Sequence, residues 1–285
     1  IDDPSAYFQT FTYTGNQSGR QITLDGNSDL QPDLYWYKAR NANHHYWVDS
    51  SRGTTKYIYS SLANAEATVA SAYVTSFNTN GFGVGGGDSG TNANGISFGN
   101  WAWKANGGTT ASNTDGSLTS TVQANQDAGF SIVTYTAADS DEVIGHGLGV
   151  TPDVIIIKRR DAGSSPWTVF FPYLTSTNKQ MYLNQTTALD TNNVKEVGAS
   201  TFRVSGWQAV AVANGTYVAY CFAEKQGYSK FGSYVGNGIA DGTFIYTGFK
   251  PAFIMVKTTL VTDEWNIYDT KRSGFNPNND ALYAS

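Results

Sequence analysis

The side chains that could act as acids, bases or nucleophiles are few, and they are not arranged in catalytic pairs. Glycoside hydrolysis, for example, needs two carboxyl groups that face each other across a cleft. None of the glutamates recurs at an equivalent position of the repeat together with an acidic partner, and most aspartates adjoin Gly, Asn or Ser, where a turn explains them. We therefore expect a non-enzymatic protein without catalytic residues. The chain has five glutamates, namely Glu66, Glu142, Glu196, Glu224 and Glu264.

The histidines and the single cysteine do not form a metal or nucleophile site in the sequence either. His44 and His45 are adjacent, and neighbours on a strand point to opposite faces, so the two cannot readily share one metal ion. His146 is remote from both, and no Gly-x-Ser-x-Gly or Cys-His pattern is present. The segment 25–29 alternates oxygen ligands as calcium loops do but lacks the terminal glutamate, so a turn is expected. We predict no metal and no cofactor.

Three prolines begin apolar runs of the same length, and these runs are internal repeats. Pro32, Pro152 and Pro251 are each followed six residues later by a lysine, and the residues between are mostly aromatic or aliphatic. Proline is tolerated at the first residue of a strand, and a short continuous apolar run is typical of a strand buried on both faces. Each run is therefore predicted to be the central buried strand of its repeat.

Further landmarks follow each proline in the same order. A tryptophan comes 14 or 15 residues later, as Trp47, Trp167 and Trp265, and an apolar residue followed by tyrosine comes after it. Because the tryptophans recur with the strand framework, we predict that they fill the cores. The apolar-tyrosine pairs are Ile58-Tyr59, Met181-Tyr182 and Leu282-Tyr283.

The repeats divide the chain into four parts. We expect a β-sandwich repeat over 1–105, and a Gly/Ser/Thr/Asn-rich linker or hairpin over 106–129. A second sandwich repeat is expected over 130–226, and a partial third over 227–285, which we interpret as a fragment of a longer arrangement. Discrete units on short connections are the expected organisation.

Composition predicts an all-β fold of tandem sandwich-like units with little helix. Charged residues make up 14%, against about 25% in ordinary globular chains, while 30 glycines and 18 tyrosines are present. Aromatic and β-branched residues suit a pleated sheet, and Gly or Asn supplies the turns between strands. Only Ser61–Val74 has the alanine-rich composition of a helix, so one short helix is expected at most.

Charge and hydropathy exclude two classes of partner. The net charge of −5 and the scattered Lys and Arg residues argue against nucleic-acid binding, which depends on clustered cations. No run approaches 18 apolar residues, so no membrane insertion is predicted. Cys221 lies in an apolar strand pattern, and we expect it to be buried.

A few aromatic and histidine side chains are less constrained by the repeat and are candidates for stacking on sugars. Trp207, Tyr35 and Tyr37, together with His44 and His45, are the predicted surface contacts for glycans.

Several segments resemble a repeat domain of tail-fibre and other virion structural proteins of marine tailed bacteriophages (cyanophage-like). The resemblance spans nearly the whole chain and implies a structural protein located in the virion, in the tail or another external appendage. It implies partners among other virion tail proteins and, in some cases, host-surface glycans; a fibre further suggests a homo-oligomer, with a trimer favoured. The segments that carry it are 8–16, 30–33, 49–53, 101–104, 145–153, 217–224, 227–234 and 268–272.

A second class of function remains open at this point. The aromatic residues and the expected sandwich fold also suit a carbohydrate-binding lectin or a carbohydrate-active enzyme, and a fold alone does not choose between these functions.

Overall fold

A computed structural model describes residues 1–40, 44–69, 73–86, 90–172, 179–191, 193–272 and 280–284. Strands dominate these residues, and the helical structure among them is one 3₁₀ turn, η1 (Pro4–Ala6), capped by the Asp3 carboxylate. The all-β, sandwich-like fold predicted from composition is confirmed.

The alanine-rich segment expected to allow a helix forms none in its described part. It contains the short strand β6 (Ala67–Thr68), which pairs with β5 (Lys56–Tyr59) at the edge of the first sheet. Ladder hydrogen bonds to an existing strand outweigh the weak preference of alanine for helix. Residues 70–72 of this segment lie outside the described residues.

The first large sheet has six antiparallel strands in the order β1-β9-β3-β4-β5-β6. The run that begins at Pro32 forms β3, which lies between β9 and β4 and is buried, as predicted for a central strand. Its remaining strands are β1 (Phe8–Thr14), β3 (Leu34–Ala39), β4 (His45–Asp49) and β9 (Ser97–Trp103).

The second large sheet repeats that strand order within its eight strands, β10-β11-β12-β20-β14-β15-β16-β17. From β12 to β17 each strand takes the place of one strand of the first sheet, with β14 again central and buried. These strands are β12 (Phe130–Thr136), β14 (Val154–Arg159), β15 (Thr168–Phe170), β16 (Lys179–Tyr182), β17 (Asp190–Thr191) and β20 (Thr216–Phe222).

The connection between the two repeats is tied down at both ends. It contains the hairpin of β10 (Ala111–Asn113) and β11 (Ser120–Asn125), and β11 pairs with β12. At its start the Asp33 carboxylate accepts hydrogen bonds from the backbone of Ala105 and Gly107, both 2.8 Å. The hairpin alternative therefore describes this segment, and a flexible tether does not.

Each large sheet is covered on its outer face by a small three-stranded sheet, which makes each unit a two-layer sandwich. The orders β2-β8-β7 and β13-β19-β18 again correspond. Phe82 of β8 packs on Tyr35 of β3 with ring centroids 4.1 Å apart, and Phe202 and Val204 of β19 are buried against the second large sheet. The small sheets comprise β2 (Arg20–Ile22), β7 (Val74–Asn78), β8 (Gly81–Val84), β13 (Asp141–Gly145), β18 (Val194–Val197) and β19 (Thr201–Ser205).

The third unit has a three-stranded sheet, and here the prediction of a central buried strand is wrong. β21 (Phe253–Val256) pairs with β22 (Asn266–Asp269), which pairs with β23 (Leu282–Tyr283), so β21 is at the edge. These three strands correspond to β3-β4-β5, and no described strand takes the place of β9. Without that neighbour β21 is only partly buried.

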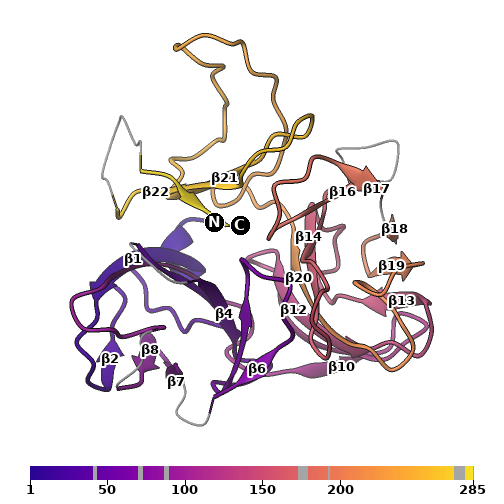
Figure 1. Cartoon of the computed structure of the whole chain (residues 1–285), viewed down its shortest axis with the longest axis horizontal. Helices are drawn as coiled ribbons and strands as arrows, with labels where there is room; N and C mark the ends of the chain where they lie inside the picture. Colours follow the sequence, from indigo (N-terminus) through magenta and orange to yellow (C-terminus); the bar gives the residue numbers. More distant parts are fainter. Residues whose placement is uncertain are drawn as a thin grey trace.

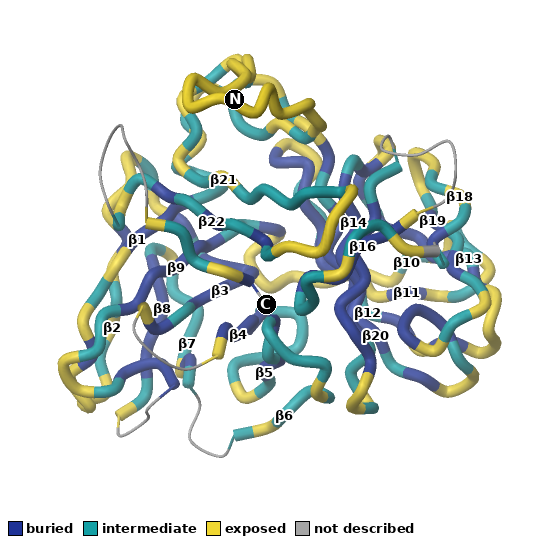
Figure 2. The backbone as a smooth tube through the Cα atoms, turned by 45° about the horizontal axis from the view of Figure 1, so that its top comes forward, coloured by how far each residue is buried: buried dark blue, intermediate teal, exposed yellow. Residues whose placement is uncertain are grey.

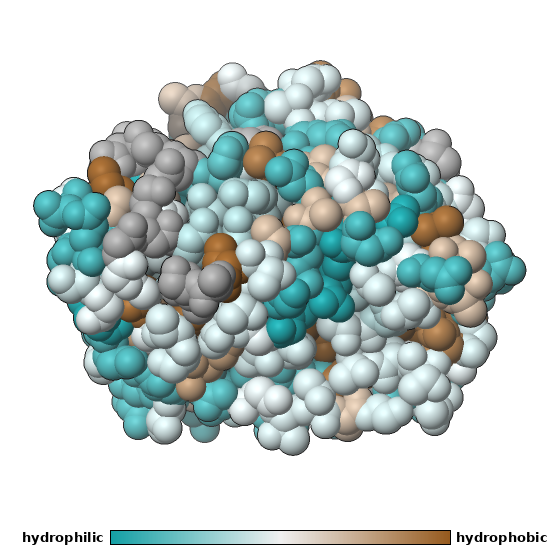
Figure 3. Space-filling view, turned by 60° about the horizontal axis from the view of Figure 1, so that its bottom comes forward, coloured by the Kyte–Doolittle hydropathy of each residue, from teal (hydrophilic) through white to brown (hydrophobic). Residues whose placement is uncertain are grey.

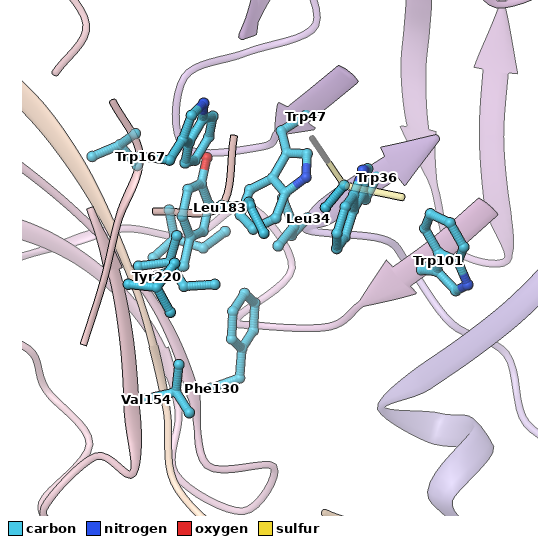
Figure 4. Close-up of a cluster of buried hydrophobic side chains, with 14 of the residues drawn as sticks. Leu34, Trp36, Trp47, Trp101, Phe130, Val154, Trp167, Leu183 and Tyr220 are labelled. Atoms are coloured by element: carbon cyan, nitrogen blue, oxygen red, sulfur yellow. The ribbon is translucent and has the colours of Figure 1, made fainter. Parts of the chain in front are cut away.

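The two large sheets and the three-stranded sheet of the third unit surround one shared hydrophobic core, so the units are not separate bodies on short connections. Figure 1 shows the sheets around a common centre. Trp47, Trp167 and Trp265 are at most 2% exposed and belong to a single cluster, which confirms their predicted core role. In Figure 4, Trp167, Trp47, Trp36 and Trp101 lie across this cluster, with neighbouring ring centroids 4.9 to 5.1 Å apart. Area burial and aromatic packing in this core tie the units together.

The strand register shows that Trp47 is not structurally equivalent to Trp167 and Trp265, although all three lie at a similar distance from their prolines in the sequence. Trp47 lies opposite Trp36 of β3, and the matching position opposite Ile156 of β14 is Val169. Opposite Met255 of β21 the register places Ile267. Trp167 and Trp265 lie two residues earlier, at the position that His45 occupies in the first unit. The loops that join β3 to β4, β14 to β15 and β21 to β22 differ in length, so counting residues from the prolines does not give the structurally equivalent positions.

Trp167, Trp265 and His45, which occupy equivalent positions, each face a tyrosine of another unit. In each case it is the tyrosine of the repeated apolar-tyrosine pair. The Trp167 indole N–H donates to the Tyr59 carbonyl oxygen at 2.8 Å. The Trp265 indole N–H donates to the Tyr182 carbonyl oxygen, also at 2.8 Å. Both repeated motifs thus serve one purpose, which is to join each unit to its neighbour.

His45 occupies the corresponding place between the first unit and the third. Its Nδ1 accepts a hydrogen bond from the Trp36 indole N–H at 3.2 Å, which leaves the proton of a neutral ring on Nε2. Nε2 makes no hydrogen bond of ordinary length to the described residues, but the backbone of Tyr283 lies close enough to act on the pKa of His45. The cycle runs from the first unit to the third, from the third to the second and from the second to the first.

We predict that Trp265→Phe lowers the free energy of unfolding by about 2 kcal/mol, because it removes buried volume and leaves the Tyr182 carbonyl with only the longer hydrogen bond from the Gln185 backbone N–H. The matched control is Trp207→Phe, since Trp207 is half-buried and its indole N–H makes no hydrogen bond with the described residues. The control should cost less than about 1 kcal/mol. Urea denaturation followed by circular dichroism measures both, and equal losses would contradict the linking role of Trp265.

Candidate interaction surface and buried polar network

Two of the predicted glycan contacts, Tyr35 and Tyr37, are buried, and the prediction for them is wrong. Both are 0% exposed. Their rings stack on each other at 5.0 Å, and the Tyr35 hydroxyl donates to Asn100 Oδ1 at 2.6 Å. The small sheet covers this face of β3, in agreement with the prediction that the Pro32 run is buried on both faces. Burial raises the pKa of Tyr35 well above its ordinary value.

The two adjacent histidines have different surroundings. His45 is 2% exposed, so its predicted surface contact is also wrong. His44 is exposed, with its ring edge-on to Tyr59 at 5.2 Å and Nδ1 at 3.4 Å from the Ser61 hydroxyl. His44 therefore keeps the accessibility that a ligand contact needs.

Trp207 is half-buried on the second unit and packs edge-on against Tyr182 with centroids 5.6 Å apart. The Tyr182 hydroxyl donates to Asp190 Oδ2 at 2.7 Å and accepts from Gln180 at 3.0 Å. Burial, followed by the hydrogen bond to Asp190, raises the pKa of Tyr182 to about 12. An aromatic face beside carboxylate and amide groups has the chemistry of a sugar contact. Trp207 and His44 are far apart in the sequence and lie on different units.

A buried ionic network joins the first and second units. The Arg52 guanidinium contacts Asp49 at 2.5 Å and Glu66 at 3.0 Å, and the side chains of Arg52 and Asp49 are fully buried. Arg160 of the second unit reaches Glu66 at 2.8 Å. The Tyr220 hydroxyl, also from the second unit, donates to Asp49 Oδ2 at 2.6 Å.

The same arrangement joins the third unit to the first. Arg272 contacts Asp269 at 2.6 Å, with both side chains at most 2% exposed. The Trp101 indole N–H donates to Asp269 Oδ2 at 3.1 Å. Trp101 and Tyr220 occupy equivalent positions on β9 and β20, opposite Trp36 and Ile156. The sequence analysis did not identify this network, although the repeated Asp-x-x-Arg spacing at 49–52 and 269–272 was its visible signal.

Pairing opposes the effect of burial on the pKa values of Arg52 and Glu66. Burial alone would lower the pKa of Arg52, but Asp49, Tyr220 and Glu66 raise it above its ordinary value. Burial would raise the pKa of Glu66, but hydrogen bonds and charge from Arg160 and Arg52 lower it. Oppositely charged groups that hold each other ionised are suited to joining units and poorly suited to proton transfer.

The remaining buried reactive groups are also engaged or inert. His146 accepts from the Leu148 backbone N–H at 3.2 Å and lies 3.1 Å from the Gly198 carbonyl oxygen, and burial lowers its pKa. Burial raises the pKa of Cys221 to about 12, so its thiol stays protonated, and its predicted burial is confirmed. Burial lowers the pKa of Lys158 to about 8. The described residues contain no cluster of three His, Cys, Asp or Glu side chains suited to a metal ion.

Exposed apolar side chains gather on the third unit. Among the described residues, eleven large hydrophobic side chains are exposed, and all but Val150 belong to residues 234–283. By contrast, hydrophobic residues on the face shown in Figure 3 are scattered among polar ones. Concentrated apolar exposure marks an interaction surface. We call these residues the third-unit apolar surface: Tyr234, Val235, Ile239, Phe244, Ile245, Tyr246, Ile254, Leu260, Val261 and Tyr283.

The described residues contain no helical segment whose length and apolarity would let it span a bilayer.

Comparison with known proteins gives one match. Residues 3–285 match a family model described as "Domain of unknown function (DUF7483)". Neither the curated proteins nor the solved structures contain a match to the chain.

We predict that Arg52→Met lowers the free energy of unfolding by about 3 to 5 kcal/mol, because Asp49 would remain buried without its counter-charge and Glu66 would keep only Arg160. Arg203→Met is the matched control: Arg203 pairs with Asp141 and Glu196 in solvent, with 38% of its side chain exposed. The control should cost less than about 1 kcal/mol. Chemical denaturation measures both variants, and a loss for Arg52→Met no larger than for the control would refute the structural role of the network.

We also predict that stability falls as pH drops below about 6.5, the ordinary pKa of histidine. Burial, then Lys38, and more weakly His44 and Arg272, lower the pKa of His45 well below that value, against the Tyr283 backbone, which raises it. The unfolded chain therefore binds a proton that the folded chain excludes, at a cost of up to about 1.4 kcal/mol per pH unit.

His45→Gln, which cannot take up a proton, should reduce this pH dependence by the share of one histidine, while His146 continues to contribute. Urea midpoints measured between pH 7 and pH 5 test this expectation. Identical slopes for the variant and the parent would show that His45 is not the group responsible.

Proposed function

The chain belongs to the DUF7483 family, and we propose that it is a non-enzymatic structural protein of a bacteriophage virion, placed in the tail or a tail fibre. The main support for the proposal is that the buried charged groups form contacts between the units. Asp49, Arg52, Glu66 and Asp269, which could otherwise do chemistry, each bond to a side chain of another unit, namely Tyr220, Tyr220, Arg160 and Trp101. A protein whose reactive side chains hold its parts together is suited to a mechanical role.

Two further features support an assembly role. The third-unit apolar surface provides an area for contact with another protein. The units share one core without any disulfide, and the single cysteine is buried and free. An external appendage must stay folded without cytoplasmic maintenance, and a closed three-unit core suits that demand. The sequence resemblance to tail-fibre proteins of marine tailed phages points to the same role, with other tail proteins as partners and a homotrimer as the form of self-association.

Contact with host-surface glycans forms the second part of the proposal. Trp207 with its Tyr182, Asp190 and Gln180 surroundings, and exposed His44 beside Tyr59, are the candidate contacts. The competing function is a free lectin or a carbohydrate-active enzyme, which the same aromatic residues would serve.

We predict that mass spectrometry of purified phage particles detects this chain at a copy number that is a multiple of three. A particle free of the chain would contradict the virion assignment, and another copy number would contradict the trimer. Glycan arrays with product analysis separate the competing function, because release of oligosaccharides would contradict a non-enzymatic role. Binding without cleavage that Trp207→Ala weakens by about tenfold would place the glycan contact at Trp207.

A further inference from the structure

Among the described residues, the repeated strand order of the units is interrupted at the free edge of β21. In the first unit β3 is flanked by β9 on this edge, and in the second unit β14 is flanked by β20. β21 corresponds to both, and among the described residues it pairs with β22 alone. An unpaired edge presents backbone donors and acceptors that another extended chain can pair with.

The segment that would flank the missing strand on its far side is also without a partner strand. β1 and β12 pair along all seven of their residues with β9 and β20. Their counterpart in the third unit, centred on Tyr234, forms no strand and is exposed from residue 232 onward. It belongs to the loop drawn in orange at the top of Figure 1 and mostly as exposed in Figure 2. Among the described residues no strand pairs with this segment or with the free edge of β21, and both would be neighbours of the same missing strand.

The outer face of β21 is bare where its counterparts are covered. Ile254 is 45% exposed, whereas Tyr35 and Ile155, at the same position relative to their prolines, are 0% exposed. The inward residues Phe253 and Met255 nevertheless pack against the shared core. β21 thus occupies the position that the central strands β3 and β14 take in the other units. One of its edges and its outer face remain accessible.

The two strands that fill this place in the other units define the chemistry of the missing one. β9 reads Ser-Phe-Gly-Asn-Trp-Ala-Trp and β20 reads Thr-Tyr-Val-Ala-Tyr-Cys-Phe. Both have aromatic residues at the second, fifth and seventh positions and small residues at the fourth and sixth. The fifth residue lies opposite Trp36 in one unit and Ile156 in the other, so Met255 would lie opposite it in the third.

The contacts between units also indicate which side chain the fifth residue of the missing strand would contact. In β20 and β9 this residue, Tyr220 or Trp101, donates to the aspartate of another unit, Asp49 or Asp269. The register places Phe171 of the second unit at the equivalent position, one residue beyond the Ile155–Phe170 pair. Phe171 is apolar and accepts no hydrogen bond through its side chain. The aromatic residue at the fifth position of the missing strand therefore needs no hydrogen-bond donor, whereas Tyr220 and Trp101 each donate a hydrogen bond.

We propose that the edge of β21 is a docking site for an extended partner segment with the aromatic pattern of β9 and β20. The segment adds antiparallel to β21 and places its central aromatic residue opposite Met255 and against Phe171. This is strand addition to an open sheet edge, in which backbone hydrogen bonds give affinity and alternate side chains give specificity. The proposal rests on the third sheet and does not depend on the virion assignment.

The test uses the full chain and a synthetic peptide with the sequence of residues 215–225, GTYVAYCFAEK. Hydrogen exchange measured by mass spectrometry should show that the peptide slows exchange in Phe253–Val256 by about tenfold and leaves β4 unchanged. The same peptide with proline at the Tyr220 position is the matched control, because proline removes a ladder donor. It should give no protection.

A second variant keeps the test independent of peptide solubility. The peptide sequence is fused after Ser285 through a flexible Gly/Ser linker, and the fusion should protect β21 without added peptide and abolish peptide binding. Equal protection by both peptides, or unchanged exchange at β21 in the fusion, would overturn the proposal. Protection of β21 that rises with protein concentration alone would show that a second copy covers the edge, and would overturn it as well.

Discussion

The structure depends on a hydrogen bond from a buried indole N–H in one unit to a tyrosine carbonyl in the next. Trp167 to Tyr59 and Trp265 to Tyr182 are such bonds, with His45 facing Tyr283 in the remaining place. A buried indole N–H is stabilised by an acceptor, and the carbonyl oxygens of Tyr59 and Tyr182, the last residues of β5 and β16, provide one. Satisfying both at once forces each unit against its neighbour, and the aromatic core forms around these contacts.

Charged groups follow the same cycle in the layer beside the core. Tyr220 bonds to Asp49, and Trp101 bonds to Asp269, so β20 and β9 each reach into another unit. Each aspartate is held by an arginine three residues later. Because the partners come from different units, the network specifies how the units are arranged as well as how strongly they are held. The second unit replaces its aspartate with Phe171, which faces the position where no closing strand is described.

The fold class and the core tryptophans could be predicted from the sequence, because composition and repetition report directly on strands and burial. The glycan contacts were less predictable. Tyr35 and Tyr37 are little constrained by the repeat, yet they belong to a run predicted to be buried on both faces, and the small sheet buries them. The match of Trp47 with Trp167 failed because hairpin length shifts the register, a quantity that residue counting does not contain. Contacts between units, such as Tyr220 with Asp49, join residues 171 positions apart.

The central claim is that three units fold as one body around a shared core. Native-state hydrogen exchange at increasing denaturant concentration tests it most directly, because it reports the free energy of opening for each strand separately. The account predicts that the most protected amides of β4, β15 and β22, one strand from each unit, converge on a single global free energy of unfolding. A β22 that opens completely while β4 and β15 keep their full protection would contradict it.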